Sequence, residues 1–208
     1  MTTLIIARHG NTFDPHEIPR RVGAKTNLPL VAKGREQAAA LGHYLKDNDL
    51  VPDRIFTSRL QRTVETAYVA IQEAGCRRAP MTPLEIFDEI DYGPDENQTE
   101  QDVIARIGID AITAWDERAA VPDGWIVDPE KIIQNLHNFA DNLINQYEYE
   151  TILVVTSNGI ARFIPHLTED FETFRQHQKL KISTGALCVL KHDHETGWTI
   201  EDWNVRPS

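Results

Sequence analysis

Cysteine is scarce in this chain of 208 residues, which has only Cys76 and Cys188, far apart in sequence. Two distant cysteines exclude a disulfide framework and a metal site of the Cys-x-x-Cys kind. The chain also lacks any apolar run approaching the roughly 18 residues of a membrane span. Its first residues, MTTLIIARHG, lack the basic segment of a signal peptide. We therefore expect a cytoplasmic protein with no membrane partner.

Positive charge is in deficit, because 21 lysines and arginines face 32 acidic residues, for a net charge of −11 at pH 7. An acidic surface disfavours nucleic acid and anionic membranes as partners. No Gly-x-Gly-x-x-Gly follows a predicted strand, which argues against a dinucleotide cofactor. The length predicts one domain over residues 1–208, with a helical and loop excursion at about 93–130 over the active site. Oligomeric state stays open, with a homodimer among the possibilities.

Strand and helix patterns alternate along the chain. Apolar runs predict strands, and apolar residues at helical spacing predict helices. The strands are expected at 2–7, 53–58 and 151–156, and the helices at 34–50 and 59–75. Such alternation indicates βαβ units and hence an α/β fold with a mostly parallel central sheet.

The middle and the tail of the chain carry more local signals. Thr99 with Asp102 resembles a capping box that opens a helix through 103–115. Asp128 followed by proline predicts a second helix start. The segment 183–203 is typical of a hairpin that turns at its Glu-Thr-Gly step.

The segment RHGNT, from Arg8 to Thr12, comes directly after the first predicted strand. This order places a cation and an imidazole at the carboxyl edge of the sheet, and Gly10 allows the backbone to approach a ligand closely. A phosphate fits here, because arginine offers a fork of donors and an imidazole can attack phosphorus. The residue types alone fit equally well a surface arginine and a histidine that supports the strand end.

Two further segments contain charged residues that could bind or act on a phosphate. Ser58 with Gln61 forms a capping-box pattern, so we expect a helix to begin at about Arg59 and to place Arg62 in its first turn. Arginine is unfavourable there unless an anion binds, and the alternative is a solvated arginine. Glu89 lies in an acid-rich stretch, where a carboxyl beside bound phosphate could serve as a general acid. The alternative is a solvated acidic loop.

Taken together, these segments resemble the histidine phosphatase superfamily, in its phosphoglycerate-mutase-like group. Four stretches are similar to family motifs: LIIARHGNT to the opening strand and RHGxT, NLPLVAKGREQAAALG to PLTxxGxxQA, TSRLQRTVETA to SPLxRAxQTA, and IFDEIDYG to the acid loop. The resemblance spans nearly the whole chain in the right order. It implies a mostly parallel sheet flanked by helices on both faces.

The resemblance also implies roles for individual residues. His9 would take the phosphoryl group as a phosphohistidine, and Arg8 and Arg62 would clamp the phosphate oxygens. Glu89 would protonate the leaving group and later help water to attack. The partner implied is a small phosphorylated substrate, with no cofactor and no metal, because the arginines supply the positive charge.

One family motif is broken in this sequence. The family's pocket strand ends in Ser/Thr-His-Gly, whereas here Ser157 follows Thr156 and Asn158 replaces the glycine. Ser157, with Asn158, could donate neutral hydrogen bonds and sustain a slow phosphatase. Alternatively, the substrate or Arg20, Arg21 or Lys25 supplies a cation, or the chain binds a phosphate ligand without turnover. Ser157 as a nucleophile lacks the Gly-x-Ser-x-Gly elbow.

We expect hydrolysis rather than mutase activity, because the segment between the acid loop and the Ser157 strand is too modest to shield an intermediate from water. Where the mutases usually follow RHG with Trp-Asn, this chain has Asp14-Pro15. Arg20 and Arg21, if they face the cleft, predict a second anionic group on the substrate. His192 and His194 are expected to be solvated rather than metal ligands. The expected substrate contacts are Asn11, Thr12, Arg21, Ser157 and Asn158.

Overall fold

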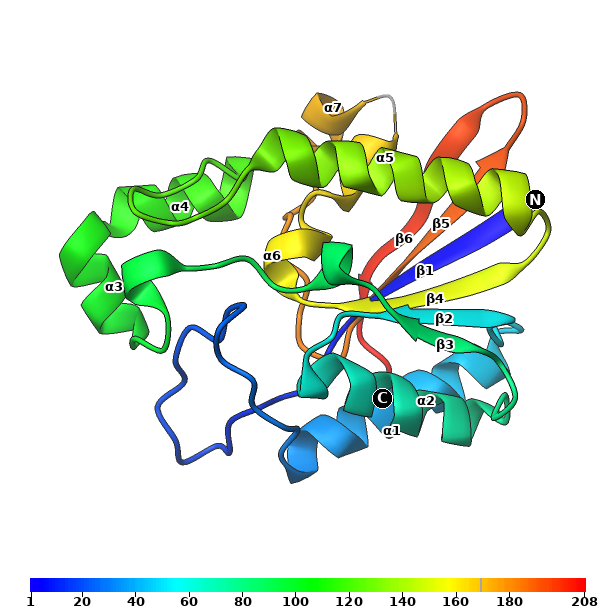
Figure 1. Cartoon of the computed structure of the whole chain (residues 1–208), viewed down its shortest axis with the longest axis horizontal. Helices are drawn as coiled ribbons and strands as arrows, with labels where there is room; N and C mark the ends of the chain where they lie inside the picture. Colours follow the sequence, from blue (N-terminus) through cyan, green and yellow to red (C-terminus); the bar gives the residue numbers. More distant parts are fainter. Residues whose placement is uncertain (169) are drawn as a thin grey trace.

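A computed structural model describes residues 1–168 and 170–208 (Figure 1). Within these residues the centre is a sheet in the order β3-β2-β4-β1-β5-β6. The strands are β1 (Thr2–Arg8), β2 (Arg54–Thr57), β3 (Met81–Pro83), β4 (Thr151–Thr156), β5 (Leu187–Asp193) and β6 (Gly197–Val205). The first four in the sheet order are parallel, and β5 runs antiparallel to both its neighbours. The mostly parallel sheet and the C-terminal hairpin are thus confirmed.

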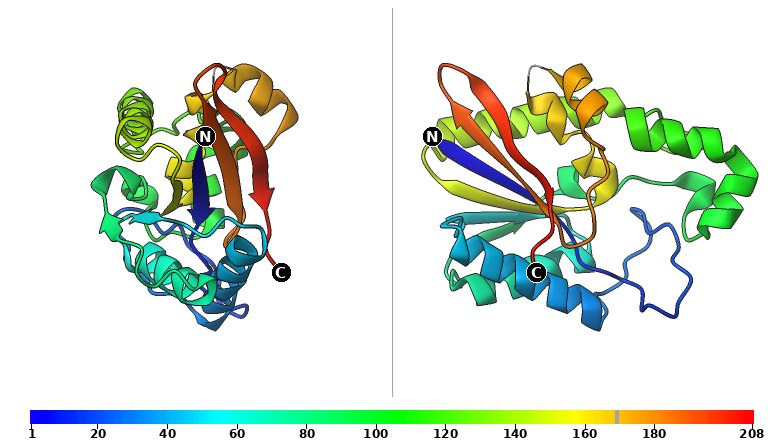
Figure 2. Two further views of the ribbon diagram at one scale, coloured as in Figure 1. Left: turned by 90° about the vertical axis from the view of Figure 1, so that its right-hand side faces the viewer. Right: turned by 180° about the vertical axis from the view of Figure 1, so that it is seen from behind.

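Helices cover both faces of the sheet (Figures 1 and 2). They are α1 (Ala32–Asp47), α2 (Gln61–Ala74), α3 (Glu100–Ile107), α4 (Ile109–Arg118), α5 (Pro129–Gln146), α6 (Asn158–Ala161) and α7 (Phe171–His177). Short 3₁₀ turns are η1 (Glu85–Phe87), η2 (Gly93–Asp95) and η3 (Ile164–Leu167). Helices α1 and α2 lie on one face and α5 on the other (Figure 1). In the part of the chain described, no helix has the length and apolarity to cross a membrane. That residues 1–208 form a single domain stays a prediction.

The residues of β1 alternate between two apolar cores. Ile5 and Ala7 belong to the core that contains Leu41 of α1. Leu4 and Ile6 belong to the core that contains α5, and all four β1 side chains are fully buried. A strand covered on both faces is apolar at every position, which is why the sequence shows a continuous apolar run here.

The carboxyl ends of β1, β2 and β4 point to the same end of the sheet (Figure 1). The loop that follows β1 and the helices α3 and α4 gather at that end (Figure 1). In open α/β sheets this edge is where ligands bind. The topology therefore brings the RHGNT segment, the start of α2 and the Ser157 turn together.

Local caps confirm some predicted boundaries and correct others. Thr99 accepts a hydrogen bond from the Asp102 N–H in a capping box, and Asp128 caps α5. The predicted helix over 103–115 is interrupted at Gly108, whose φ of 82° ends α3 and lets α4 begin in a new direction.

The capping box predicted at Ser58 is wrong. Helix α2 begins at Gln61, and its N-cap residue, Leu60, makes no side-chain cap. The Ser58 hydroxyl instead lies 2.6 Å from the Thr63 hydroxyl and accepts a hydrogen bond from the Leu60 N–H. These contacts hold Ser58 in the strand-to-helix turn, so the helix starts two residues later than predicted. Arg62 still lies in its first turn.

The close packing of α1 on α2 depends on Gly42. A Cβ at this position would lie 2.3 Å from the Ala70 carbonyl oxygen, which is backbone and cannot move aside. We expect Gly42→Ala to lower the free energy of unfolding by about 1–2 kcal/mol, because overpacking outweighs the helix preference of alanine. Urea denaturation measures the change.

Lys46→Ala, at an exposed position of the same helix, is the matched control and should stay within about 0.5 kcal/mol of the wild type. A Gly42→Ala protein as stable as the wild type would contradict the expected clash between the helices.

Candidate active site

His9 follows β1 and is almost fully buried, with 6% of its surface exposed. Its Nδ1 lies 2.8 Å from the Gly10 carbonyl oxygen. A carbonyl oxygen can only accept, so Nδ1 carries the hydrogen and Nε2 keeps its lone pair. Burial, and then the nearby Arg62 and Arg8, lower the pKa of His9 well below its usual range. The ring is therefore a neutral imidazole with a basic Nε2.

Arg62 directs its guanidinium at that nitrogen. The Arg62 Nε–H donates to His9 Nε2 at 3.2 Å. The remaining nitrogens donate to backbone carbonyls, Nη1 to Thr26 at 2.8 Å and Nη2 to Val22 and Gly23 at 3.3 Å each. Arg62 has no exposed surface, and burial lowers its pKa. Its cation is thus fixed beside the imidazole by the loop that contains these carbonyls.

Glu96 holds this loop in place. Its Oε1 accepts hydrogen bonds from the Gly23 and Lys25 N–H groups, at 3.0 and 3.1 Å, and from the Thr26 hydroxyl at 2.6 Å. The carbonyls that fix Arg62 therefore depend on a side chain far away in sequence. The sequence analysis did not identify Glu96, and nothing in its local pattern separates it from its acidic neighbours.

Arg8 is anchored on one side only. Its Nη1 donates to the Ile182 carbonyl at 2.6 Å, while its buried Nε has no hydrogen-bond partner among the described residues. The Ile182 N–H donates to Asn158 Oδ1 at 2.9 Å. That contact fixes the amide orientation of Asn158, so its NH₂ group points away from Ile182. Arg8 and Asn158 both keep donors for an anion.

Glu89 is buried at the same end of the sheet, with 6% of its surface exposed. Its carboxyl accepts hydrogen bonds from the Ile90 N–H at 2.9 Å and the Gly159 N–H at 3.2 Å. Burial raises the pKa of Glu89 above its usual range, although Arg62 acts in the opposite direction. A Cβ at residue 159 would lie 2.1 Å from Glu89 Oε1, so glycine is required for this approach.

Arg8 of β1 pairs with Thr156 of β4, and His9 and Ser157 are the residues that directly follow this pair. The backbones at His9 and Ser157 are therefore neighbours. The His9 N–H also donates to the Thr156 carbonyl at 3.1 Å. Ser157 is fully buried, and its hydroxyl finds no hydrogen-bond partner in the described part of the chain. A buried hydroxyl without a partner is costly, and a bound anion would satisfy it.

A cavity of about 680 Å³ opens over these groups. Residues predicted from the sequence that line it are Arg8, His9, Asn11, Thr12, Arg20, Arg21, Glu89 and Asn158. Arg62 and Ser157 are buried behind this lining. Lys25 does not reach the cavity; it forms an ion pair of 2.7 Å with Asp91.

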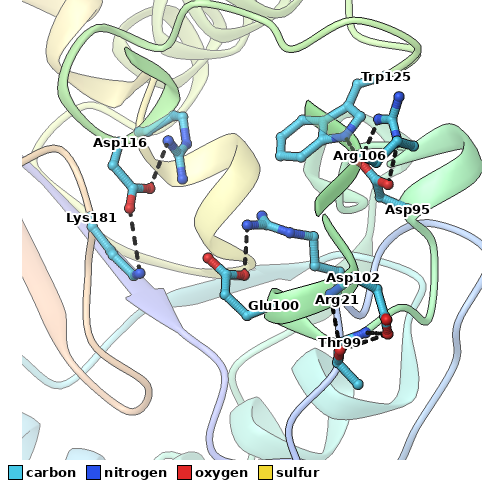
Figure 3. Close-up of polar contacts among 10 residues, drawn as sticks. Arg21, Asp95, Thr99, Glu100, Asp102, Arg106, Asp116, Trp125 and Lys181 are labelled. Atoms are coloured by element: carbon cyan, nitrogen blue, oxygen red, sulfur yellow. Dashed lines mark hydrogen bonds and ion pairs between the residues drawn. The ribbon is translucent and has the colours of Figure 1, made fainter. Parts of the chain in front are cut away.

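Arg20 and Arg21 differ in their surroundings. Arg20 is exposed and donates to a backbone carbonyl at 3.0 Å. Arg21 lies between the cavity and the rings of Tyr92 and Trp125, 5.4 and 4.9 Å from their centroids, and its Nη2 pairs with Glu100 at 2.8 Å (Figure 3). The positive charge of Arg21 is thus already matched by a carboxylate.

The cavity also has residues that the sequence analysis missed. Arg162 is 1% exposed, donates to the Trp115 carbonyl at 2.6 Å and stacks on the Trp115 ring at 3.9 Å. Lys181 and Asp116 line the cavity beside it. A signal for Arg162 was present, since a charged residue inside the apolar run GIARFIP is unusual unless it is paired or functional.

No group of three or more His, Cys, Asp or Glu side chains that could hold a metal ion occurs among residues 1–168 and 170–208. His192 and His194 face one another with ring centroids 5.5 Å apart on the C-terminal hairpin. The charged groups at the cavity are instead guanidinium groups, an ammonium and carboxyls. The arrangement suits recognition of an anion beside a nucleophilic imidazole.

The family described as "Histidine phosphatase superfamily (branch 1)" matches residues 4–206. The chain belongs to this superfamily. Phosphoglycerate mutase 1 of Saccharomyces cerevisiae is 27% identical over 122 residues, which are 59% of this chain and 49% of the mutase. The chain thus matches about half the length of that curated superfamily relative.

Solved structures of superfamily proteins show the same fold. The alpha-ribazole phosphatase from Shigella flexneri has a TM-score of 0.73 and 24% identity, covering 98% of this chain and 96% of that one. A mycobacterial glucosyl-3-phosphoglycerate phosphatase, solved in complex with VO3, has a TM-score of 0.78 and 20% identity, covering 98% of both chains. Identities this low establish the fold alone, so activity is argued from the site.

Glu89→Gln tests the buried carboxyl without reference to activity. The folded protein holds the Glu89 proton more tightly than the unfolded chain, because its pKa is raised on folding. The stabilisation that protonated Glu89 contributes is complete below its pKa in the unfolded chain, about 4.3. This stabilisation is lost as the pH rises through the pKa of Glu89 in the folded protein. We expect the unfolding free energy of the variant, relative to wild type, to increase from about pH 4 to pH 8.

Urea denaturation at each pH gives this difference. Glu117→Gln, which removes an exposed carboxylate on α4, is the control and should not reproduce the rise. A difference for Glu89→Gln that decreases with pH would mean that the carboxylate, not the carboxylic acid, is the form that the fold favours.

Proposed function

We propose that this protein is a phosphatase that hydrolyses a small phosphomonoester through a phosphohistidine on His9. The observation that carries the proposal is the state of the His9 ring, whose Nδ1–H is held by the Gly10 carbonyl while Nε2 faces a buried arginine. A neutral, oriented imidazole in an anion-attracting cavity is a nucleophile suited to phosphorus. The phosphatase names of two structural relatives support hydrolysis.

Arg8 and Arg62 hold the phosphoryl oxygens in this proposal. Arg62 Nε already touches His9 Nε2, so it lies where the oxygens of an attacked phosphoryl group must pass. Arg8 lines the cavity with a buried Nε that has no partner in the described residues. Fixed cations of this kind stabilise the charge of the transition state without reorganisation.

In the first step His9 Nε2 attacks phosphorus, and the bond from phosphorus to the ester oxygen breaks. Glu89, whose pKa is raised by burial, gives the proton of its acid form to the leaving alkoxide, so a neutral alcohol departs. In the second step a water attacks the phosphohistidine, and the Glu89 carboxylate accepts a proton from it. The P–N bond breaks, and inorganic phosphate leaves with His9 and Glu89 restored.

Hydrolysis fits the architecture better than a mutase reaction. The segment between Glu89 and Ser157 consists of the short helices α3 and α4 and the longer α5, and α5 packs on the sheet rather than over the cavity. A mutase must retain its phosphoenzyme away from water, which this short excursion is poorly suited to do.

His9→Ala tests the covalent step. We expect wild-type protein, incubated with a ³²P-labelled aryl phosphate and quenched rapidly, to contain an acid-labile, alkali-stable phosphoryl group that is absent in His9→Ala. His43→Ala, an exposed histidine on α1, should retain the label and serves as the control. Turnover without any label, or a label that survives in His9→Ala, would place the nucleophile elsewhere.

A second candidate is a phosphate-binding protein without turnover, and the observation that favours it is serine at residue 157. It predicts that vanadate or phosphate raises the melting temperature, that Arg8→Ala removes the rise, and that no phosphomonoester is hydrolysed. We favour the phosphatase because Ser157 follows the strand that pairs with the one before His9, and its buried hydroxyl, without a partner in the described residues, is available to donate to a phosphoryl oxygen.

Ser157→Ala tests that donation. Loss of one preorganised donor lowers kcat by a factor of about 10²–10³, and we expect kcat of Ser157→Ala to fall by this factor or by a somewhat smaller one. Thr57→Val is a matched control, because the Thr57 hydroxyl is also buried at a strand end without a partner in the described residues, yet Thr57 ends β2, which does not pair with the strand that precedes His9. Equal kcat in Ser157→Ala and wild type would mean that Ser157 does not take over the role of the missing histidine.

A further inference from the structure

The cavity wall formed by α4 and the segment before β5 carries a charge imbalance. Asp116 lies 3.6 Å from Arg162 Nη1 and 3.6 Å from Lys181 Nζ, so two cations share one carboxylate (Figure 3). All three residues line the cavity. Arg162, Lys181 and Asp116 together therefore carry a net charge of +1.

Neither cation is fully bound by Asp116. Charge-assisted hydrogen bonds are about 2.7–2.9 Å long, and both contacts exceed this. Arg162 is 1% exposed and is held by the carbonyl and the ring of Trp115, so its guanidinium cannot move out to water. A buried cation with only a loose counter-ion, here a carboxylate that is 34% exposed, is costly unless an anion completes its surroundings.

The other charged groups at the cavity do not offset this excess. Glu100 is paired with Arg21 at 2.8 Å. Asp14 and Glu17 stand together on the exposed loop after β1, where the Asp14 N–H donates to Glu17, and Arg20 is on the same loop. Glu89 lies at the phosphate end and interacts electrostatically with both Arg62 and Arg162, so it does not serve Arg162 alone.

We propose that Arg162 and Lys181 form a second anion subsite, which binds an anionic group on the alcohol part of the substrate. The substrate class is then a phosphomonoester that carries a further carboxylate or phosphate. Asp116 occupies the subsite loosely when it is empty and competes with the substrate anion. This inference rests on the proposed phosphatase function, and it moves the expected second anion from Arg20 and Arg21 to Arg162 and Lys181.

The test uses matched pairs of esters that differ only in the remote group. A series of ω-carboxyalkyl phosphates of increasing chain length is compared with the corresponding ω-hydroxyalkyl phosphates and α,ω-alkyl bisphosphates. We expect the carboxylate or the second phosphate to raise kcat/KM about 10- to 100-fold at the best chain length, the range of a charge-assisted contact. The ratio of kcat/KM between each anionic ester and its hydroxyl counterpart shows whether the subsite prefers a carboxylate or a second phosphate.

Variants of the subsite should change this ratio in opposite directions. Lys181→Met should lower the preference for the anionic ester about two- to fivefold, as for a partly exposed ion pair, and Asp116→Asn should raise it. Arg162→Met should lower this preference further. If Arg162→Met prevents folding because Arg162 is buried, Lys181→Met still tests the subsite. Lys179→Met and Glu117→Gln, at exposed positions nearby that do not line the cavity, should leave the ratio unchanged.

Calorimetry of the same ester pairs on the His9→Ala protein reads the preference without turnover. Equal affinity and equal kcat/KM within each pair would overturn the subsite while leaving the phosphatase intact. A preference that is present in binding, lowered in Lys181→Met, and accompanied by no hydrolysis in wild type would support the subsite and overturn the phosphatase.

Discussion

The contact between Arg62 Nε and His9 Nε2 is the interaction on which the rest of the site depends. A buried guanidinium must satisfy all its N–H groups, and here the carbonyls of the loop 22–26 supply the partners. That loop has no regular secondary structure, so the Glu96 carboxylate fixes its shape. The orientation of the nucleophile thus rests on a chain of polar contacts rather than on apolar packing.

Burial has opposite effects on the two titratable groups of the reaction and favours the neutral form of both. It lowers the pKa of His9 and raises that of Glu89, so burial shifts both groups toward their uncharged forms. The arginines nearby keep their charge because no acceptable neutral form exists for them in proteins. Arg62 and Arg162 are buried cations at this end of the sheet, and their charge would attract a phosphate dianion.

The sequence predicts the features that depend on local chemistry. The strand before Arg8 and the capping box at Thr99 follow from residues that are adjacent or three apart. The break at Gly108 was missed because apolar spacing continues across it, and only the positive φ reveals the turn. Glu96 was missed because its partner Thr26 lies 70 residues away, and the partner of Arg162, 47 residues away, could not be named even though its apolar surroundings marked it as unusual. Folding, not sequence spacing, brings such charges together.

The cavity is built by two sets of segments with separate origins in the chain. Its phosphate end comes from strand ends and the first turn of α2, all anchored in the sheet. The opposite wall comes from α4 and the segment before β5, which contribute Asp116 and Lys181. Substitutions in the second set would therefore change the wall opposite His9 while the strand ends that carry His9 and Ser157 stay the same.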